Sequence, residues 1–397
     1  MAGLVERSDS RRYEIERKKH KRNFLITSII GIIAVIIIFA YLLNSFFNKS
    51  YNGYEVIKTT KRTDSNTVKY VRYHNGILKY SRDGAQAFNA DGEVLWNGSY
   101  DLKNPQADIC QEYVAIADIG GDEVYVFNGK DSGTKLETVL PIMQVEVASQ
   151  GVVALLLEDN NSNVISIQDP YDTAKPEKAI VPTNVSTDGY PIDISLSNDG
   201  VKLMTSYFNI NSGVIKSSVS FYDFGEVGKN KVNKIVGARD FGKTLVPRIE
   251  FIGNDTACAF GENSFRIFSN MENPKDVYKE TFKKEIKSVF YNSDFIGFVL
   301  ENFDADKKYE VVVYNLNGKK ILDKQINFDY KEVYISGKEI TFYSDLECVI
   351  LRLNGNEKFH YTFDKNVDYI MPINHWDKYL LIDDNNLEEI KLTEGKQ

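Results

Sequence analysis

Apolar and polar residues follow two patterns along the chain, one confined to residues 24–47 and the other repeated over the rest. Residues 24–47 read FLITSIIGIIAVIIIFAYLLNSFF and contain no charged residue. A helix of this length reaches roughly 36 Å and crosses a hydrocarbon core of about 30 Å with some tilt. No A-x-A cleavage pattern follows the run, and no cysteine lies near its end. The pattern therefore predicts an uncleaved transmembrane signal-anchor helix over 24–47.

A basic cluster immediately precedes the apolar run. Residues 1–23 carry eight Lys or Arg and four Asp or Glu, and seven of the basic residues fall between Arg11 and Arg22. Basic residues beside a membrane span are retained in the cytoplasm, where they also attract anionic lipid. We therefore predict a cytoplasmic tail at 1–23, a single pass through the cell membrane, a short linker at 48–53 and an extracytoplasmic region at 54–397. Binding of nucleic acid or of a cytoplasmic partner by the tail is the alternative interpretation.

Beyond the apolar run, the dominant pattern is a short alternating strand, a turn rich in Asn, Asp or Gly, and a second strand. It recurs at 85–100, 124–140, 164–181, 219–236, 265–282, 311–328 and 349–363, with a truncated copy at 387–392. Two further strand-like runs precede each copy. The apolar residues that close the first strand of each pair lie 37 to 55 residues apart, at Phe88, Phe127, Ile167, Tyr222, Phe268, Tyr314, Leu353 and Ile390.

This repeat predicts an all-β fold, because four short antiparallel strands per ~40–45 residues is the period of a β-propeller blade. We expect eight blades, with seven as the alternative because blade boundaries within 164–247 are irregular. The last copy lacks its fourth strand, and a β-prone segment at 54–62 precedes the first complete copy. Pairing of 54–62 with 387–392 would close the ring and remove exposed sheet edges.

Charge and cysteine content limit the classes of protein to which the outer region can belong. The chain has a formal net charge of −8, and the eight basic and four acidic residues of the tail leave residues 24–397 with a charge of −12. An acidic region of this kind does not favour binding to nucleic acid. The three cysteines, Cys110, Cys258 and Cys348, lie far apart in apolar strand-like stretches, which indicates buried free thiols rather than a disulfide framework.

The segment FNADGEVLW, from Phe88 to Trp96, resembles the quinoprotein-type (PQQ-like, WD40-like) propeller repeat, in which a turn glycine precedes a strand that ends in Trp. The whole layout is similar to a bacterial family of single-pass, membrane-anchored propellers of unknown function. The other copies lack this Trp, and Trp376 lies elsewhere in the last copy. The adjacent cysteine pair of quinoprotein dehydrogenases is also missing, so the resemblance implies a propeller without a quinone cofactor.

Motifs that carry chemistry are sparse. The four histidines, His20, His74, His360 and His375, show no metal-ligand spacing. Ser132 and Lys135 match the S-x-x-K pattern of penicillin-interacting enzymes, but that chemistry needs the Ser at a helix start. Here the pattern predicts a turn between strands. We therefore predict no catalytic, cofactor-binding or metal site.

Acidic residues recur in the loops between the second and third strands of the copies. Equivalent propeller loops emerge on one face, so these carboxylates would share a binding rim with Asn160, Asn161 and Asn163. Ordinary solvated turns and a calcium site are the alternatives, although no loop has the D-x-[DN]-x-[DN]-G spacing. The candidate rim residues are Asp118, Asp122, Glu123, Glu158, Asp159, Glu301, Asp304, Asp306, Asp383 and Asp384.

Together these patterns predict a membrane-tethered, non-enzymatic binding or scaffolding module. Its partners would be the lipid bilayer, through residues 24–47, and a protein or cell-envelope component, but no nucleic acid. Two alternatives remain: a cell-envelope enzyme, such as a polysaccharide hydrolase or lyase, and a sensor of a small ligand. The enzyme requires clustered carboxylates with perturbed pKa values in a pocket.

Overall fold

The computed structural model describes residues 17, 19, 21–39, 41, 48–62, 67–159, 162–211, 213–302, 307–373 and 376–394. The chain divides into two compact units, Met1–Tyr51 and Asn52–Gln397. In the first unit the helix Lys21–Phe39 is long and apolar enough to cross a membrane, which fits either a membrane anchor or a signal sequence. Residues 40 and 42–47 of the predicted span lie outside the described residues.

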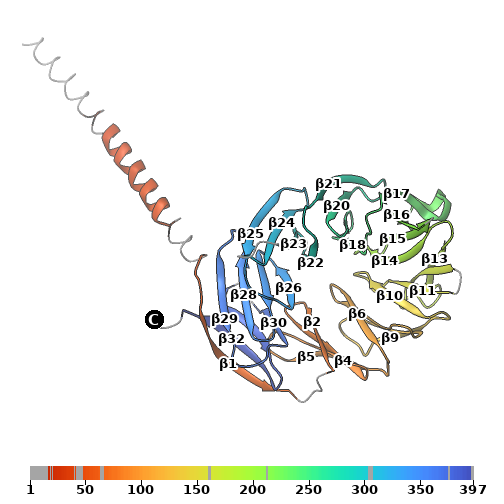
Figure 1. The fold of residues 1–397 in the computed structure, drawn as a ribbon. Coiled ribbons are helices and arrows are strands. Elements are labelled where there is room, and N and C mark those ends of the chain that lie inside the picture. The colour runs from red at the N-terminus through yellow and green to blue at the C-terminus, as the bar shows by residue number, and fades with distance from the viewer. Residues whose placement is uncertain are drawn as a thin grey trace, which may run out of the picture. The chain divides into compact units, whose positions relative to one another are not determined.

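The second unit is a ring of eight four-stranded antiparallel sheets, the blades of a β-propeller (Figure 1). In seven blades the strands follow one another from the centre outward. The innermost strands of blades 1 to 8 are β2 (Lys69–Tyr73), β6 (Pro105–Cys110), β10 (Ile142–Val147), β14 (Tyr190–Leu196), β18 (Arg248–Phe251), β22 (Ile286–Tyr291), β26 (Glu332–Ser336) and β30 (Tyr369–Pro372). The second strands are β3 (Gly76–Tyr80), β7 (Tyr113–Asp118), β11 (Val153–Glu158), β15 (Lys202–Asn211), β19 (Thr256–Phe260), β23 (Phe295–Glu301), β27 (Glu339–Tyr343) and β31 (Lys378–Ile382).

The outer half of each blade follows the same order. The third strands are β4 (Gly84–Phe88), β8 (Glu123–Phe127), β12 (Ser162–Gln168), β16 (Val214–Asp223), β20 (Ser264–Ser269), β24 (Tyr309–Asn315), β28 (Glu347–Arg352) and β32 (Asn386–Thr393). The outermost strands are β5 (Val94–Ser99), β9 (Thr134–Glu137), β13 (Glu177–Asn184), β17 (Ile235–Gly242), β21 (Lys275–Thr281), β25 (Lys320–Ile326), β29 (Glu357–Thr362) and β1 (Gly53–Lys61). Two short 3-10 turns, Gly228–Asn230 and Val232–Lys234, lie between β16 and β17.

Strand composition changes with distance from the centre because neighbouring blades cover the inner strands on both faces. In β11 the residues from Val153 to Leu157 are all buried, so the strand is apolar throughout rather than alternating. The outermost strand β21 reads KDVYKET and is mostly exposed. The core is accordingly a series of apolar layers between adjacent blades. One such layer joins Ala115 and Ala117 of β7 to Val145 and Val147 of β10.

The eighth blade is formed by strands from the beginning and from the end of the propeller sequence. β1 pairs antiparallel with β32, with Tyr54 opposite Leu392, Val56 opposite Ile390 and Thr60 opposite Leu387. The outermost strand of blade 8 therefore comes from the beginning of the propeller and its other three strands come from the end.

The prediction of an all-β, eight-bladed propeller is confirmed. Seven of the eight sequence markers lie in third strands, and Leu353 follows the end of β28 by one residue. The irregular region belongs to blade 4, where β15 and β16 have ten residues each and the 3-10 turns precede β17. This longer blade accounts for the widest interval between markers.

The single repeat tryptophan packs in the seam between blades 1 and 2. The indole of Trp96 in β5 stacks on the ring of Phe127 in β8, with centroids 4.6 Å apart and an interplanar angle of 16°. A Cβ at Gly98 would come within 2.3 Å of the same Phe127 ring. Glycine at position 98 is therefore required by this close approach, because any larger side chain would displace the stack.

We expect Ile390→Ala to lower the free energy of unfolding by about 2–4 kcal/mol, because Ile390 is fully buried in the closing sheet and its truncation leaves a cavity. Ile57→Ala is the matched control, since Ile57 lies on the partner strand but is 46% exposed. Its effect should stay within about 0.5 kcal/mol. Urea denaturation followed by tryptophan fluorescence measures both, and equal losses would contradict a closing role for this sheet.

Candidate functional site

The two faces of the ring are built from different connections. One face holds the loops between second and third strands together with the blade-to-blade connections, and we call it the loop face. The two kinds of connection are joined there by main-chain hydrogen bonds, such as Glu158 N to Pro141 O at 2.9 Å and Ile286 N to Glu262 O at 2.9 Å. The other face, the turn face, holds the turns between first and second strands and between third and fourth strands.

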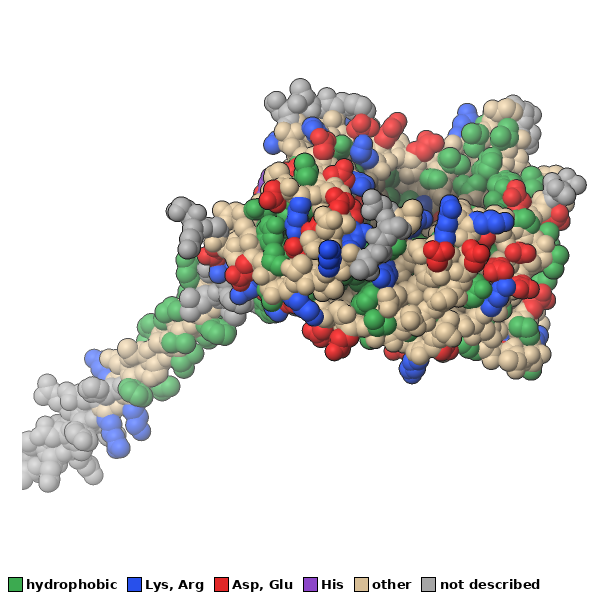
Figure 2. Space-filling view, turned by 90° about the horizontal axis from the view of Figure 1, so that it is seen from below, with side chains coloured by type: hydrophobic (Ala, Val, Ile, Leu, Met, Phe, Trp, Pro, Cys, Tyr) green, Lys and Arg blue, Asp and Glu red, His purple; other side chains and the backbone are tan. Residues whose placement is uncertain are grey.

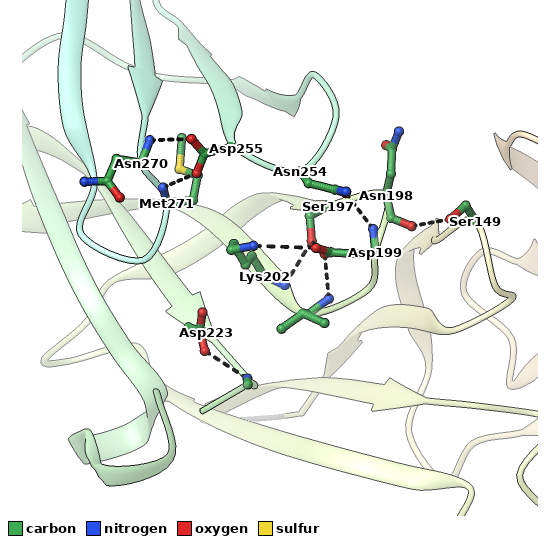
Figure 3. Close-up of polar contacts among 12 residues, drawn as sticks. Ser149, Ser197, Asn198, Asp199, Lys202, Asp223, Asn254, Asp255, Asn270 and Met271 are labelled. Atoms are coloured by element: carbon green, nitrogen blue, oxygen red, sulfur yellow. Dashed lines mark hydrogen bonds and ion pairs between the residues drawn. The ribbon is translucent and has the colours of Figure 1, made fainter. Parts of the chain in front are cut away.

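Polar groups on the turn face bind one another from blade to blade (Figure 3). The hydroxyl of Ser149 in blade 3 donates to Asn198 O in blade 4 at 2.7 Å. In turn, Asn198 N donates to Gly253 O of blade 5 at 3.3 Å, and Asp199 N donates to Asn254 Oδ1 at 2.8 Å. The turns of blades 3, 4 and 5 thus form one hydrogen-bonded chain, which leaves few of their polar groups for a ligand.

Four hollows lined by the described residues lie on the loop face. They have volumes of about 900 Å³ between blades 3 and 4, 760 Å³ across blades 5 to 7, 770 Å³ across blades 7, 8 and 1, and 280 Å³ on blade 1. The second and third share Lys331, Glu332 and Val333 at the start of β26. Figure 2 views the ring from its side and shows one face hollowed between raised edges. The three larger volumes are in the range of ligand pockets.

The hollow between blades 3 and 4, which we call the blade 3/4 hollow, combines polar and apolar groups from three loops. Glu158, Asp159 and Asn163 come from the loop between β11 and β12 and from the start of β12. The rest come from the connections that precede and follow blade 3. The full lining is Leu140, Pro141, Glu158, Asp159, Asn163, Asn184, Val185, Ser186 and Tyr190.

Three of the predicted rim residues are held by internal contacts. Asp118 is buried and its Oδ1 accepts a hydrogen bond from Asn104 N at 2.7 Å. Asp383 is buried and lies 2.9 Å from Lys365 Nζ. Burial opposes the ionisation of Asp383, but Lys365 and the main-chain hydrogen bonds from Asn385 and Asn386 together lower the pKa of this carboxyl. Glu123 pairs with Lys135 at 2.7 Å. These carboxylates stabilise the loops in which they lie.

The remaining rim residues are distributed around the loop face rather than gathered at one place. Asp122 is exposed and Glu301 is half-buried at the end of β23. Asp384 is exposed, accepts a hydrogen bond from Asn366 at 3.1 Å and lines the hollow of blades 7, 8 and 1. Among the rim residues that the structure describes, Glu158 and Asp159 come together in one hollow, with Asn163 beside them. Four residues of the predicted rim lie outside the described residues: Asn160, Asn161, Asp304 and Asp306.

The histidines and cysteines show no metal arrangement among the described residues. His74 is exposed in the turn after β2, and His360 Nε2 lies 2.7 Å from a Glu347 oxygen. In the described part of the chain no group of three His, Cys, Asp or Glu side chains suits a metal ion. Two histidines lie outside that part, His20 and His375.

The S-x-x-K match begins at Ser132 in the turn between β8 and β9, as the strand pattern predicts, and its second half belongs to β9. Lys135 is on β9 and its ammonium lies 2.7 Å from both Glu123 and Glu137. The hydrogen bonds that the Lys135 ammonium donates to Glu123 and, to a lesser extent, to Glu137 raise the pKa of Lys135 and keep the amine protonated. A protonated amine cannot act as the general base that this motif supplies in serine enzymes.

The sequence prediction missed a cluster of four acidic residues on the innermost strands of blades 2 to 5: Asp108, Glu146, Asp193 and Glu250. All four are half-buried. Two of the carboxylates accept hydrogen bonds from main-chain N–H groups of the neighbouring blade's innermost strand: Asp108 from Val147 N and Asp193 from Ile249 N, each at 2.6 Å. Each acid stands between two apolar residues of its strand, and this interruption in four consecutive blades is the signal that could have identified them.

The four carboxylates repel one another around the centre of the ring, and burial disfavours their charged forms. Burial raises the pKa of Asp108 and of Asp193 to about 6, against the hydrogen bonds that these carboxylates accept. It raises the pKa of Glu250 to about 7, where the charges of Asp108 and Asp193 add to the shift. Burial, with the charges of Asp108, Glu250 and Asp193, places the pKa of Glu146 well above its usual value.

We expect this cluster to make the propeller less stable as pH rises from about 4.5 to about 8. The pKa of Glu250 is higher in the folded chain than its ordinary value of 4.5, so its contribution to stability is complete below about pH 4.5 and is lost as pH rises through about 7. Glu250→Gln keeps the side chain neutral. It should raise the free energy of unfolding at pH 8 by about 1–2 kcal/mol and flatten the pH dependence.

Urea denaturation at a series of pH values measures this effect. Glu177→Gln, which removes an exposed carboxylate from β13, controls for the loss of one negative charge. A Glu250→Gln variant with the same pH profile as the wild-type chain would contradict the raised pKa.

The fold and its hollows place the chain in the class of β-propellers. It belongs to DUF5711, a family of unknown function, with residues 47–392 matched. This membership confirms the resemblance to a propeller family without an assigned function. A comparison with curated protein sequences finds no match.

Solved structures similar to this chain are propellers of diverse origin. BamB from Moraxella catarrhalis is 11% identical, with 86% of this chain and 100% of that chain covered and a TM-score of 0.51. A eukaryotic initiation factor is 11% identical, with 86% and 88% covered and a TM-score of 0.52. The Pan2 WD40 domain of Neurospora crassa is 13% identical, with 74% and 90% covered and a TM-score of 0.42. At such identities the first two similarities show the fold alone.

Proposed function

We propose that this chain is a membrane-tethered, extracytoplasmic propeller that acts as a non-enzymatic binding or scaffolding module for a protein or a cell-envelope component. In this proposal residues 1–23 are the cytoplasmic tail and residues 24–47 anchor the chain in the bilayer. Residues 48–53 form a short linker, and the propeller of residues 54–397 lies outside. The propeller fold by itself suggests a protein-interaction module.

The observation that supports binding is the difference between the two faces of the ring. On the turn face, the polar groups of blades 3 to 5 are engaged with one another. On the loop face, four hollows expose polar and apolar side chains together. A ligand gains contacts where groups are concave and only partly engaged, so the loop face is the binding face of the module.

The central carboxylates favour the second candidate, an envelope enzyme acting on polysaccharide, because clustered acids with raised pKa values are typical of glycoside hydrolysis. A structural role accounts for half of the cluster. Asp108 and Asp193 accept hydrogen bonds from main-chain N–H groups of the next innermost strand. The Ser195 hydroxyl accepts a hydrogen bond from Phe251 N in the same way, so this contact does not require an acidic side chain. We therefore place the enzyme second. Hydrolysis of envelope polysaccharide that disappears in Glu146→Gln would reverse this order.

The native thiols make the topology testable, since all three are poorly reactive. Burial raises the pKa of Cys110 to about 11 and also raises the pKa values of Cys258 and Cys348. Ser132→Cys adds an exposed thiol on the turn face. We expect a membrane-impermeant maleimide to label Ser132→Cys in intact cells, and Ser10→Cys in the tail only after lysis. The reverse labelling order would contradict the proposed orientation.

We expect crosslinking in intact cells, followed by mass spectrometry, to join the propeller to another protein or to an envelope polymer. Crosslinks should concentrate on lysines of the loop face, such as Lys287 and Lys331, which line a hollow there. Lys229 between β16 and β17 is the turn-face control. Recovery of the chain crosslinked only to itself would contradict the binding or scaffolding function.

A further inference from the structure

The blade 3/4 hollow contains a side chain whose hydrogen-bonding groups are both unused. Asn163 is 1% exposed, and neither its Nδ2 nor its Oδ1 has a hydrogen-bond partner. Its main-chain carbonyl accepts the Thr183 hydroxyl at 2.8 Å, so only the side-chain amide is unpaired. A buried amide without a partner destabilises the free protein, because its hydrogen bonds to water are lost and not replaced.

The amide of Asn163 has one donor group and one acceptor group, which match the carbonyl and the N–H of a peptide bond. A rotation of the side chain toward the hollow presents both to a ligand. The surrounding loop is fixed by its own contacts, since Asn184 Oδ1 accepts hydrogen bonds from Ser186 N at 2.9 Å and from Ser186 Oγ at 2.6 Å. Asp188 Oδ2 in the same loop accepts Asn184 N at 2.8 Å.

The charge of the hollow favours a basic ligand. Glu158 and Asp159 are exposed in its lining, and Asp188 is exposed in the loop that borders it. No lysine or arginine is among the lining residues. A cationic side chain of a ligand would therefore meet the negative charge of Glu158 and Asp188 at this place.

Apolar side chains of β14 and of the β15–β16 hairpin form a wall on one side of the hollow. Tyr190 lines the hollow and packs on Phe208 of β15, with ring centroids 5.8 Å apart. The hairpin of β15 and β16 continues past Phe208, and Ile210 and Ile215 pair there while 62% and 44% exposed. At about 3.4 Å per residue, Ile210 lies roughly 7 Å beyond Phe208. Apolar side chains of a ligand in the hollow would contact this wall.

We propose that the blade 3/4 hollow binds an extended, basic segment of a partner protein, with the Asn163 amide pairing to a peptide bond of that segment. Lysine or arginine side chains of the segment contact Glu158 and Asp159, and its apolar side chains contact Val185 and the β15–β16 hairpin. This inference rests on the proposed binding function and names the site and the chemistry of the partner. The volume of about 900 Å³ accommodates a short peptide.

The direct test measures peptide binding to the full chain in detergent micelles by fluorescence anisotropy. The probe is a fluorescein-labelled, capped peptide of alternating lysine and valine, and the control peptide alternates glutamate and valine. We expect the basic peptide to bind and the acidic peptide to bind at least tenfold more weakly. Absence of binding by the basic peptide, or equal binding of both peptides, would overturn the proposal.

Asn163→Leu separates a binding role from a structural one. We expect it to weaken binding of the basic peptide at least tenfold while the thermal unfolding midpoint stays the same or rises, because an unpaired buried amide is removed. Glu158→Gln should weaken binding severalfold, and Glu226→Gln, an exposed acid on the turn face, should not. A lowered midpoint with unchanged peptide affinity in Asn163→Leu would show that the amide serves the fold only.

Photo-crosslinking in cells distinguishes failure of this site from failure of the proposed function. The photoreactive residue p-benzoylphenylalanine replaces Ser186 beside the hollow or Ser132 on the turn face. Adducts to one partner from Ser186 and not from Ser132 support the site. Adducts from Ser132 alone overturn the site but leave a binding module, whereas adducts from neither position contradict binding as well.

Discussion

The antiparallel pairing of β1 with β32 joins residues near the two ends of the propeller, and every blade depends on it because each blade packs between two others. The entropic cost of joining segments about 340 residues apart is roughly 5 kcal/mol, since it grows only with the logarithm of the intervening length. Ile390 and Leu392 are fully buried in this sheet, and burying two such side chains contributes about 3–6 kcal/mol. The contacts of two aliphatic residues thus offset the cost of closure.

A closed ring also determines where polar groups can remain unpaired. Four strands per blade place the turns between first and second and between third and fourth strands on one face, and the loops between second and third strands with the blade-to-blade connections on the other. On the turn face neighbouring blades contact one another directly, as between Ser149 and Asn198, and these polar groups are part of the scaffold. The hollows lie on the loop face, where loops and blade-to-blade connections of adjacent blades line them together. The proposed binding face is therefore the one on which side chains of different blades surround a common space.

The fold could be predicted from the sequence because its signal is repeated. Each blade contains the same pattern of strands and turns, so an uncertain assignment in one copy can be checked against the others. Even in the irregular blade 4 the marker Tyr222 lies in the third strand. The apolar helix was equally visible, although its orientation in a membrane stays a prediction. These features depend on residues that are close in the sequence, where periodicity is informative.

The candidate site was only partly predictable because it depends on which blades face each other in space. The acidic loops were recognised from the sequence. The sequence could not show, however, that Asp118 binds Asn104 N and Asp383 pairs with Lys365, whereas Glu158 lies in a hollow. Asn163 was noted only as a neighbour of the rim, since an unpaired amide is a property of its surroundings. The central acids were missed because each looked like a single interruption in an apolar strand.

Two features of the free chain oppose its own stability, and both lie where a ligand would act. The Asn163 amide lacks a partner although it is buried, and the carboxylates of Glu146 and Glu250 crowd the centre of the ring with raised pKa values. Tyr100 Oη and Ser217 Oγ are also buried without a hydrogen-bond partner, but each is a single hydroxyl group, whereas both polar groups of the Asn163 side chain are unpaired. Local conflicts of this kind are characteristic of binding sites, where a group is left unsatisfied in the free protein so that a partner can satisfy it. On this argument the unpaired amide supports the proposed peptide site in the blade 3/4 hollow, and the crowded carboxylates are what the alternative enzyme would use at the ring centre.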